Sequence, residues 1–166
     1  MTATSANALT DNTTGTFNTA VGRLALQDNT TGGYNVAVGD SAGEHLTTGV
    51  ESVFIGGLAG DAITTGARNI AIGYAALSAE DTGGHNVAIG RNALSVLDAG
   101  ADGHNVAIGS SAGEAVSTGV ANTIIGFNAG VALTTGDNNI IIGNDAAASA
   151  VGVDNEITLG DANISA

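Results

Sequence analysis

The sequence contains no cysteine, proline or tryptophan, and aromatic residues make up only 3% of its 166 residues. Without cysteine, the chain cannot form disulfides, zinc–thiolate centres or a catalytic thiol. With three Phe and one Met, the core must be thin and built from Val, Ile, Leu and Ala. Glycine is abundant, at 26 residues, but it lacks the Gly-X-Y period of collagen. This composition resembles that of fibrous proteins more than that of an ordinary globular domain.

Basic residues are also scarce, with three Lys and Arg against 16 Asp and Glu, so the formal net charge is −13. Nucleic acids and anionic membranes bind basic surfaces, and we therefore expect no nucleic-acid partner. No apolar run approaches the roughly 18 residues of a membrane span, and no signal peptide opens the chain. We expect no membrane insertion.

A five-residue motif recurs nine times, and its residues are called here motif positions 1 to 5. The copies are NTAVG at 18, NVAVG at 35, SVFIG at 52, NIAIG at 69, NVAIG at 86 and 105, NTIIG at 122, NIIIG at 139 and EITLG at 156. Successive copies are 17 residues apart, except for one 19-residue step caused by an insertion within Asp98–His104. We interpret residues 1–166 as one repeat array, with a degenerate coil at 1–17, regular coils at 18–155 and a closing segment at 156–166.

The motif predicts a short strand. Positions 2 and 4 hold Val, Ile or Leu, with Thr19 and Thr123 as the only polar members. Residues two apart point to the same face of a strand, so we expect this face to lie inward. Position 3 is usually Ala, with Phe54, Ile124 and Ile141 as larger members. We expect it to form a second crowded surface that packs against another chain.

Two glycines per unit mark turns, one at motif position 5 and one after a Thr-Thr pair. Each unit then has two extended pieces joined by two turns. The predicted fold is all-β: a β-solenoid or β-roll of 17-residue coils, stacked about 4.8 Å apart into a rod about 45 Å long. Coils this small bury little apolar surface, so we predict a parallel homotrimer, with a self-filled single solenoid as the alternative.

The repeat, of the form NVAIGxxAGxxLTTG, closes on NEITLGDANIS at 155–165. It resembles the repeats of phage tail fibres just upstream of an endosialidase-type intramolecular chaperone domain. It is also similar to the head repeats of YadA-type trimeric adhesins, which form a trimeric β-roll. In such fibres the closing phrase typically leads into the chaperone, so the resemblance implies a piece of a longer fibre protein or a processed fibre.

Two recurring polar features are candidates for binding. Asn occupies motif position 1 in seven copies, and stacked amides predict a hydrogen-bonded ladder, with a line of glycan-contacting amides as the alternative. The Thr-Thr pairs suggest an ice-binding face, although adjacent threonines in a strand point in opposite directions. These pairs are Thr13/Thr14, Thr30/Thr31, Thr47/Thr48, Thr64/Thr65 and Thr134/Thr135.

Histidines and carboxylates raise the question of metals and catalysis. His85 and His104 both precede the motif, where they predict a tolerant stacking position or, alternatively, a metal site. Asp98 and Asp102 lie in the insertion and suggest a solvated loop or an ion site. A glycosidase needs two acids across a cleft, but these are scattered. The acids considered are Asp40, Glu44, Asp61, Asp81, Asp98, Asp102, Glu114 and Asp145. We assign no catalytic, cofactor-binding or metal-binding residue, and we expect no enzyme activity and no cofactor.

Together these observations predict a structural fibre segment, the shaft or head of a phage or phage-like tail fibre. It would serve as a rigid spacer in the virion or on an extracellular particle surface. Expected partners are two copies of itself, other tail-fibre or baseplate proteins, and a host cell-surface glycan or receptor contacted through an insertion such as 99–103. The alternative is a stand-alone solenoid that binds ice or glycan.

Overall fold

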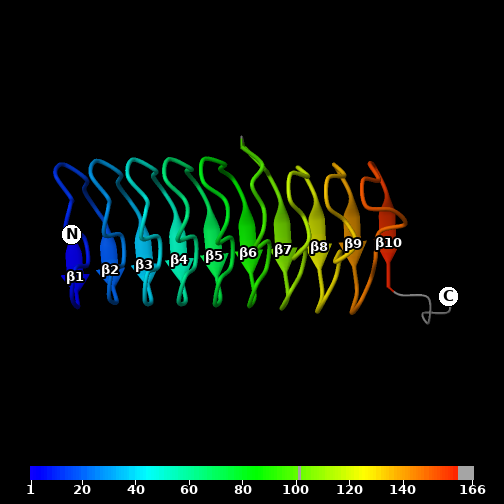
Figure 1. The fold of residues 1–166 in the computed structure, drawn as a ribbon, viewed down its shortest axis with the longest axis horizontal. Helices are drawn as coiled ribbons and strands as arrows, with labels where there is room; N and C mark the ends of the chain where they lie inside the picture. Colours follow the sequence, from blue (N-terminus) through cyan, green and yellow to red (C-terminus); the bar gives the residue numbers. More distant parts are fainter. Residues whose placement is uncertain (101, 161–166) are drawn as a thin grey trace.

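The computed structural model describes residues 1–100 and 102–160, which form ten short parallel strands and no helix. Each coil contributes one three-residue strand, and the strands follow one another along the long axis in chain order (Figure 1). They are β1 (Thr2–Thr4), β2 (Thr19–Val21), β3 (Val36–Val38), β4 (Val53–Ile55), β5 (Ile70–Ile72), β6 (Val87–Ile89), β7 (Val106–Ile108), β8 (Thr123–Ile125), β9 (Ile140–Ile142) and β10 (Ile157–Leu159). The predicted β-solenoid is thus confirmed. In the described part of the chain, no helix is long and apolar enough to cross a membrane.

The strand register follows the sequence repeat. Equivalent motif positions pair across neighbouring strands, as in Val36 with Val53. The same register holds across the 19-residue step, where Val87 pairs with Val106. The two additional residues therefore lie in the loop between β6 and β7, which projects beyond the neighbouring loops (Figure 1). Strand β1 shows that the degenerate first unit is a true coil, whereas residues 161–166 of the closing segment lie outside the described residues.

The remainder of each coil is a series of turns, so the expectation of two extended pieces per coil is wrong. Non-glycine residues there repeatedly have a positive φ, as Leu24 (61°) and Leu26 (49°) do. The motif-position-5 glycine also has positive φ, 139° at Gly22, as the sequence predicts. The glycine after the Thr-Thr pair does not need positive φ. At Gly32 the requirement is close approach, because a Cβ would collide with the carbonyl oxygen of Gly49 in the next coil.

The assignment of the inner and outer strand faces is reversed relative to the sequence prediction. Motif position 3 lies in the core: Ala37, Phe54 and Ala71 are fully buried. Positions 2 and 4 face outward and are partly exposed, as at Val38 (37%). The coil interior is narrow and accommodates one residue per strand, usually an alanine. The β-branched residues instead line the outer surface of the sheet, which their shape suits.

Core residues compensate for one another in volume. Where motif position 3 is large, the facing column has glycine: a Cβ on Gly43 would lie 2.6 Å from the Phe54 ring, and one on Gly60 would also collide with that ring. Where position 3 is Ala20 or Ala71, the same column holds a buried leucine, Leu26 or Leu77. Gly113, like Gly43, lies one coil before the large position-3 residue that it faces, here Ile124. Close packing of a thin core requires such matching. Whether Ala-Leu or Ala-Gly stands in the sequence therefore depends on the size of the position-3 side chain that packs against it.

Candidate functional site

The outer face of the ten-stranded sheet is an apolar strip. It consists of the side chains at motif positions 2 and 4, all of them Val, Ile, Leu or Thr between β2 and β10. Ile55, Ile108 and Ile142 on this face are each 37–38% exposed. The face predicted to contact another chain was position 3, which is buried in the coil. An interchain contact through the strand must therefore use positions 2 and 4, here called the sheet strip.

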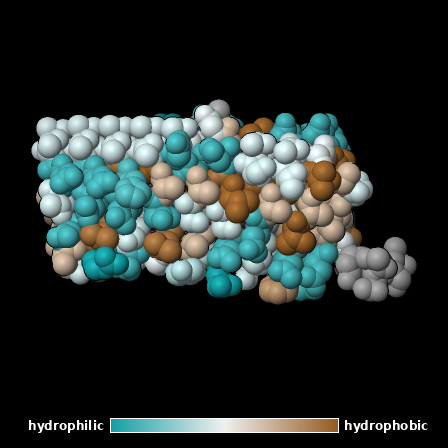
Figure 2. Space-filling view, viewed as in Figure 1, coloured by the Kyte–Doolittle hydropathy of each residue, from teal (hydrophilic) through white to brown (hydrophobic). Residues whose placement is uncertain are grey.

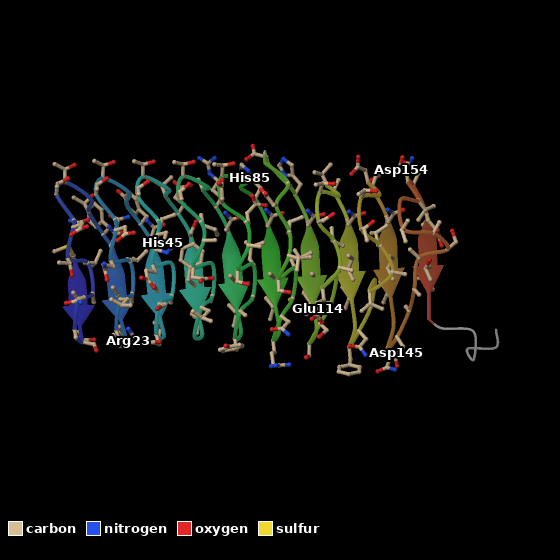
Figure 3. The ribbon with its side chains drawn as sticks, viewed as in Figure 1. Arg23, His45, His85, Glu114, Asp145 and Asp154 are labelled. Carbon is tan, nitrogen blue, oxygen red and sulfur yellow. The ribbon has the colours of Figure 1, made fainter. Side chains whose placement is uncertain are left out.

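Aromatic side chains lie beyond both ends of the strands. Phe17 and Tyr34 come two residues before β2 and β3, and their rings stack with centroids 4.8 Å apart. Tyr74 and Phe127 come two residues after β5 and β8, and both are 53% exposed. The ends of the strands lie on opposite edges of the rod, with His85 at one edge and Arg23 at the other (Figure 3). The sheet strip is thus bordered by exposed aromatic rings on both sides.

The asparagines of motif position 1 form the predicted ladder, inside the rod. Each is buried, so contact with a glycan is excluded. The amide oxygen accepts the backbone N–H of the next coil, as Asn18 Oδ1 does from Asn35 N at 2.9 Å. The amide nitrogen donates to a glycine carbonyl 14 residues on, as Asn35 Nδ2 does to Gly49 O. Most hydrogen bonds of the ladder thus join an asparagine side chain to the backbone. Within the described residues, only Asn105 and Asn139 donate to the side-chain amide of another ladder asparagine.

The two threonines of each pair have different roles. The first donates its hydroxyl to the carbonyl of the next coil, as Thr30 does to Thr47 and Thr47 does to Thr64. The second is exposed, as at Thr48 and Thr65. One free hydroxyl per coil therefore forms a single row along the rod, and the widened loop after β6 interrupts that row.

The residue before the motif forms an outer ridge of stacked neighbours. Arg68 Nε donates to Glu51 Oε2 at 2.8 Å, and its Nη1 lies 3.5 Å from His85 Nε2. The rings of His85 and His104 stack with centroids 4.9 Å apart, as the stacking interpretation predicts. Asp102, from the insertion, lies next to them, with Oδ1 3.1 Å from His85 Nδ1. These three side chains are the only described group of three or more ligand-type residues close enough to share a metal ion.

Glu80 is a buried carboxylate that the sequence interpretation overlooked. It occupies the core column of Leu46 and Ile63 and is fully buried. Its two oxygens accept the backbone N–H groups of Gly83, at 2.8 Å, and Ala99, at 3.2 Å. Burial raises the pKa of Glu80 above its ordinary value, although these hydrogen bonds oppose the shift. Counting 17 residues from Ile63 would have revealed that an acid occupies a core position.

The insertion explains why a carboxylate is needed there. In regular coils, the N–H groups around the Thr-Thr pair donate to a carbonyl one coil on, as Thr47 and Thr48 do to Thr64. The widened loop interrupts this pattern, and Glu80 supplies the missing acceptors. Asn86 Nδ2, next to the loop, is buried and has no hydrogen-bond partner. Glu80 is therefore structural, because both of its oxygens are used by the backbone.

The other acids considered from the sequence do not converge on a cleft. Asp40 forms an exposed ion pair with Arg23 at 2.7 Å, and Asp145 accepts from Asn128 at 3.1 Å. Glu114 and Asp145 lie on the outer surface of the rod, some coils from His85 (Figure 3). Of the two aspartates in the insertion, Asp102 approaches the histidines, and Asp98 is exposed.

Comparisons with known proteins identify no relative: no family model matches the chain, and neither a curated protein nor a solved structure matches it significantly.

Proposed function

We propose that this chain is a rigid, non-catalytic segment of a trimeric fibre, of the kind carried by phage or phage-like tails. The observation that supports this most directly is the unbroken parallel register of ten strands from Thr2 to Leu159. Neighbouring coils contact one another through backbone hydrogen bonds and core side chains, and in seven coils also through a buried asparagine. A rod built in this way resists bending and proteolysis, and suits a spacer that holds a receptor-binding part at a distance from a particle.

The sheet strip supports association with two further copies of the chain. It is uncharged in a protein of net charge −13, and soluble monomers rarely expose a continuous apolar surface of this kind. In a parallel copy, the strip repeats with the same coil spacing, so Val and Ile columns of neighbouring rods can match along their whole length. Figure 2 shows apolar side chains interspersed with polar ones on the visible face of the rod.

The sheet strip alone is small for a stable interface between two chains. Ten strands of three residues cover an area of roughly 430 Å², taking about 4.8 Å between strands and about 3.3 Å per residue. A stable pairwise interface usually buries about 800 Å² on each partner. The aromatic borders must therefore contribute as well. In a parallel trimer, the two neighbours of each chain would each cover one border.

The mass of the particle in solution tests this proposal. Light scattering on a sizing column should give three times the 16.0 kDa chain mass. A double variant, Ile72→Asp with Ile89→Asp, should elute as a monomer with an unchanged circular dichroism spectrum, because it places buried charge at the centre of the interface. The matched control is Thr48→Asp with Thr65→Asp, on the exposed threonine row. A monomeric wild-type chain would contradict the trimer.

A second candidate function is ice or glycan binding by a stand-alone solenoid, and the exposed row of second threonines favours it. If this function is present, wild-type protein should show thermal hysteresis or retention on a glycan array. Thr48→Val with Thr65→Val should abolish that signal without changing the fold. If a monomeric wild-type protein shows neither thermal hysteresis nor glycan retention, this candidate function is excluded. Because we propose no catalytic role, we expect the protein to release no product from polysaccharides.

A further inference from the structure

We propose that His85, Asp102 and His104 form a binding site for a divalent transition-metal ion of the zinc class. Two imidazoles and a carboxylate are a ligand set that suits Zn²⁺, with one position left for water. The candidate ligand atoms of the three residues all lie within 4.8 Å of one another. They come from successive coils, His85 before β6 and both others before β7.

The contact between His85 and Asp102 has the spacing of two ligands on one ion. Their Nδ1 and Oδ1 atoms are 3.1 Å apart, yet His85 Nδ1 has no hydrogen-bond partner although it is buried. A hydrogen bond would direct the proton along the line between the two atoms, and that alignment is lacking here. Ligand atoms around a tetrahedral Zn²⁺ are about 3.4 Å apart, given metal–ligand distances of about 2.0–2.1 Å. The two atoms are therefore already close to ligand spacing.

His104 completes the set by rotation of its ring. Its imidazole stacks on that of His85 with an interplanar angle of 24°, and this places a ring nitrogen within 4.8 Å of the ligand atoms of the other two residues. The side chain is exposed, so its ring has room on the solvent side to turn toward an ion. The open surface around His104 also leaves a path for the ion and for a water ligand.

The insertion and a glycine provide the room for Asp102. Asp102 belongs to the widened loop, which no other described coil has, and faces Gly84 in the preceding coil. A Cβ on Gly84 would lie 2.8 Å from Asp102 Oδ1 and 2.6 Å from the carbonyl oxygen of Ala67. The corresponding position holds a side chain in most other coils, such as Val50, Ala67 and Val120, and glycine again at Gly33 and Gly103. A side chain at position 84 would thus displace the carboxylate from the histidines.

Arg68 contacts the His85 ring at Nε2, whereas Asp102 lies near Nδ1. Metal binding at Nδ1 therefore changes the contact with Arg68. Its Nη1 is 3.5 Å from His85 Nε2, a long contact, and its Nε remains bound to Glu51. When Nδ1 binds a metal, Nε2 carries the ring proton and this long contact is lost. The pair with Glu51 keeps the guanidinium in place and offsets part of its positive charge.

The third histidine of the chain provides a matched control. His45 Nδ1 lies 2.8 Å from Asp28 Oδ2, and its other acidic neighbours are Glu44 and Asp61. The pair with Asp28 has the same residue types and the same spacing of one coil, but no second imidazole. Removing His45 should therefore leave the metal site unchanged.

Titration calorimetry of the full chain with Zn²⁺ tests the proposal. We expect one saturable ion per chain, with affinity reduced by about tenfold or more in His85→Ala, His104→Ala and Asp102→Asn, and unchanged in His45→Ala. Co²⁺ should give visible ligand-field bands in the wild type that the three site variants lack. Zn²⁺ should also raise the thermal unfolding midpoint of the wild type and not that of Asp102→Asn.

Three results would overturn the proposal: no saturable Zn²⁺ binding by the wild type, site variants that bind as tightly as the wild type, or an equal loss in His45→Ala. Circular dichroism of each variant separates loss of the site from loss of the fold. Counting ions per chain makes the result independent of the number of chains in the particle.

Discussion

At the scale of single residues, the core depends on matched volumes in adjacent columns. Phe54 fills the space that Gly43 and Gly60 leave. Phe54→Ala should lower the free energy of unfolding by about 3–5 kcal/mol, the usual cost of a cavity of this size. Gly60→Leu alone should also destabilise, because Phe54 already occupies the space.

The double variant Phe54→Ala with Gly60→Leu should recover part of the loss. Leucine is compatible with this column even at positive φ, since Leu26 and Leu77 adopt 49° and 53° there. Urea denaturation of the wild type, both single variants and the double variant measures the coupling. Additive losses in the double variant would contradict the volume matching.

A second prediction at this scale concerns Glu80 and pH. Burial raises its pKa in the folded protein, so the native state binds more protons than the unfolded state between the unfolded pKa, about 4.3, and the folded value. Stability contributed by this group should therefore fall as pH rises through that window. Urea denaturation at a series of pH values should show this slope in the wild type.

The Glu80→Leu variant isolates that contribution. Asp61, whose pKa burial also raises, and Glu156, whose pKa the Ser149 hydroxyl lowers, titrate in both proteins. The difference between the two stability profiles thus reports Glu80 alone. Leucine matches the neighbouring core residues but leaves the N–H groups of Gly83 and Ala99 without acceptors. Identical slopes in the two proteins would show that Glu80 has an ordinary pKa.

At the scale of the element, the buried asparagine ladder joins each strand to the turn beside it. In Asn35→Ala, the Ser52 N–H and the Gly49 carbonyl both lose their partner. Each buried unpaired group costs about 1–3 kcal/mol, so the variant should lose roughly 2–6 kcal/mol. Guanidinium denaturation followed by circular dichroism measures the loss.

The protein contains a natural control for this variant. Ser52 stands at motif position 1, and its hydroxyl still accepts the Asn69 N–H at 3.1 Å. Asn35→Ser should therefore retain the link to the next coil and cost about half as much as Asn35→Ala. A loss as large as that of alanine would show that the bond to the glycine carbonyl dominates.

The sequence predicts most of this element and misses its orientation. The 17-residue spacing specifies the strands, their register and the asparagine ladder, because each depends on periodicity alone. Alternation within a strand defines two faces without showing which one is inside. The large apolar residues of positions 2 and 4 pointed to the wrong face. A coil this narrow has room for one side chain per strand, usually a small one such as Ala37.

The proximity of Asp102 to the two histidines was not predictable in the same way. The equivalence of His85 and His104 follows from the repeat, and the stacked rings confirm it. Asp102 belongs to an insertion without counterpart in other coils, so no periodic argument places it. Glu80, in contrast, was predictable from its column, and only its hydrogen-bond partners required the structure.

At the scale of the whole molecule, the free energy of unfolding should depend on the number of coils and of interfaces between them. Removal of residues 19–35 joins Asn18 to Val36 and deletes one complete period, so every remaining residue keeps its column. This shortened chain should fold, with an unchanged circular dichroism spectrum per residue and a lower free energy of unfolding, because one coil interface is lost.

Removal of nine residues, 19–27, is the matched control for that deletion. It shifts the register of the first coil against the next and moves apolar residues out of the core. It should therefore lose the cooperative unfolding of the N-terminal coils. Equal stability of the two deletions would contradict a register-based fold.

The pairing of Val87 with Val106 is intact across the widened loop, so the length of the rod does not depend on the length of its loops. Extra residues at a corner increase the girth of the rod and leave its length unchanged. Length then depends only on the number of coils and grows in fixed increments of about 4.8 Å for each. A loop of any coil can therefore be extended without changing the distance between the two ends of the rod.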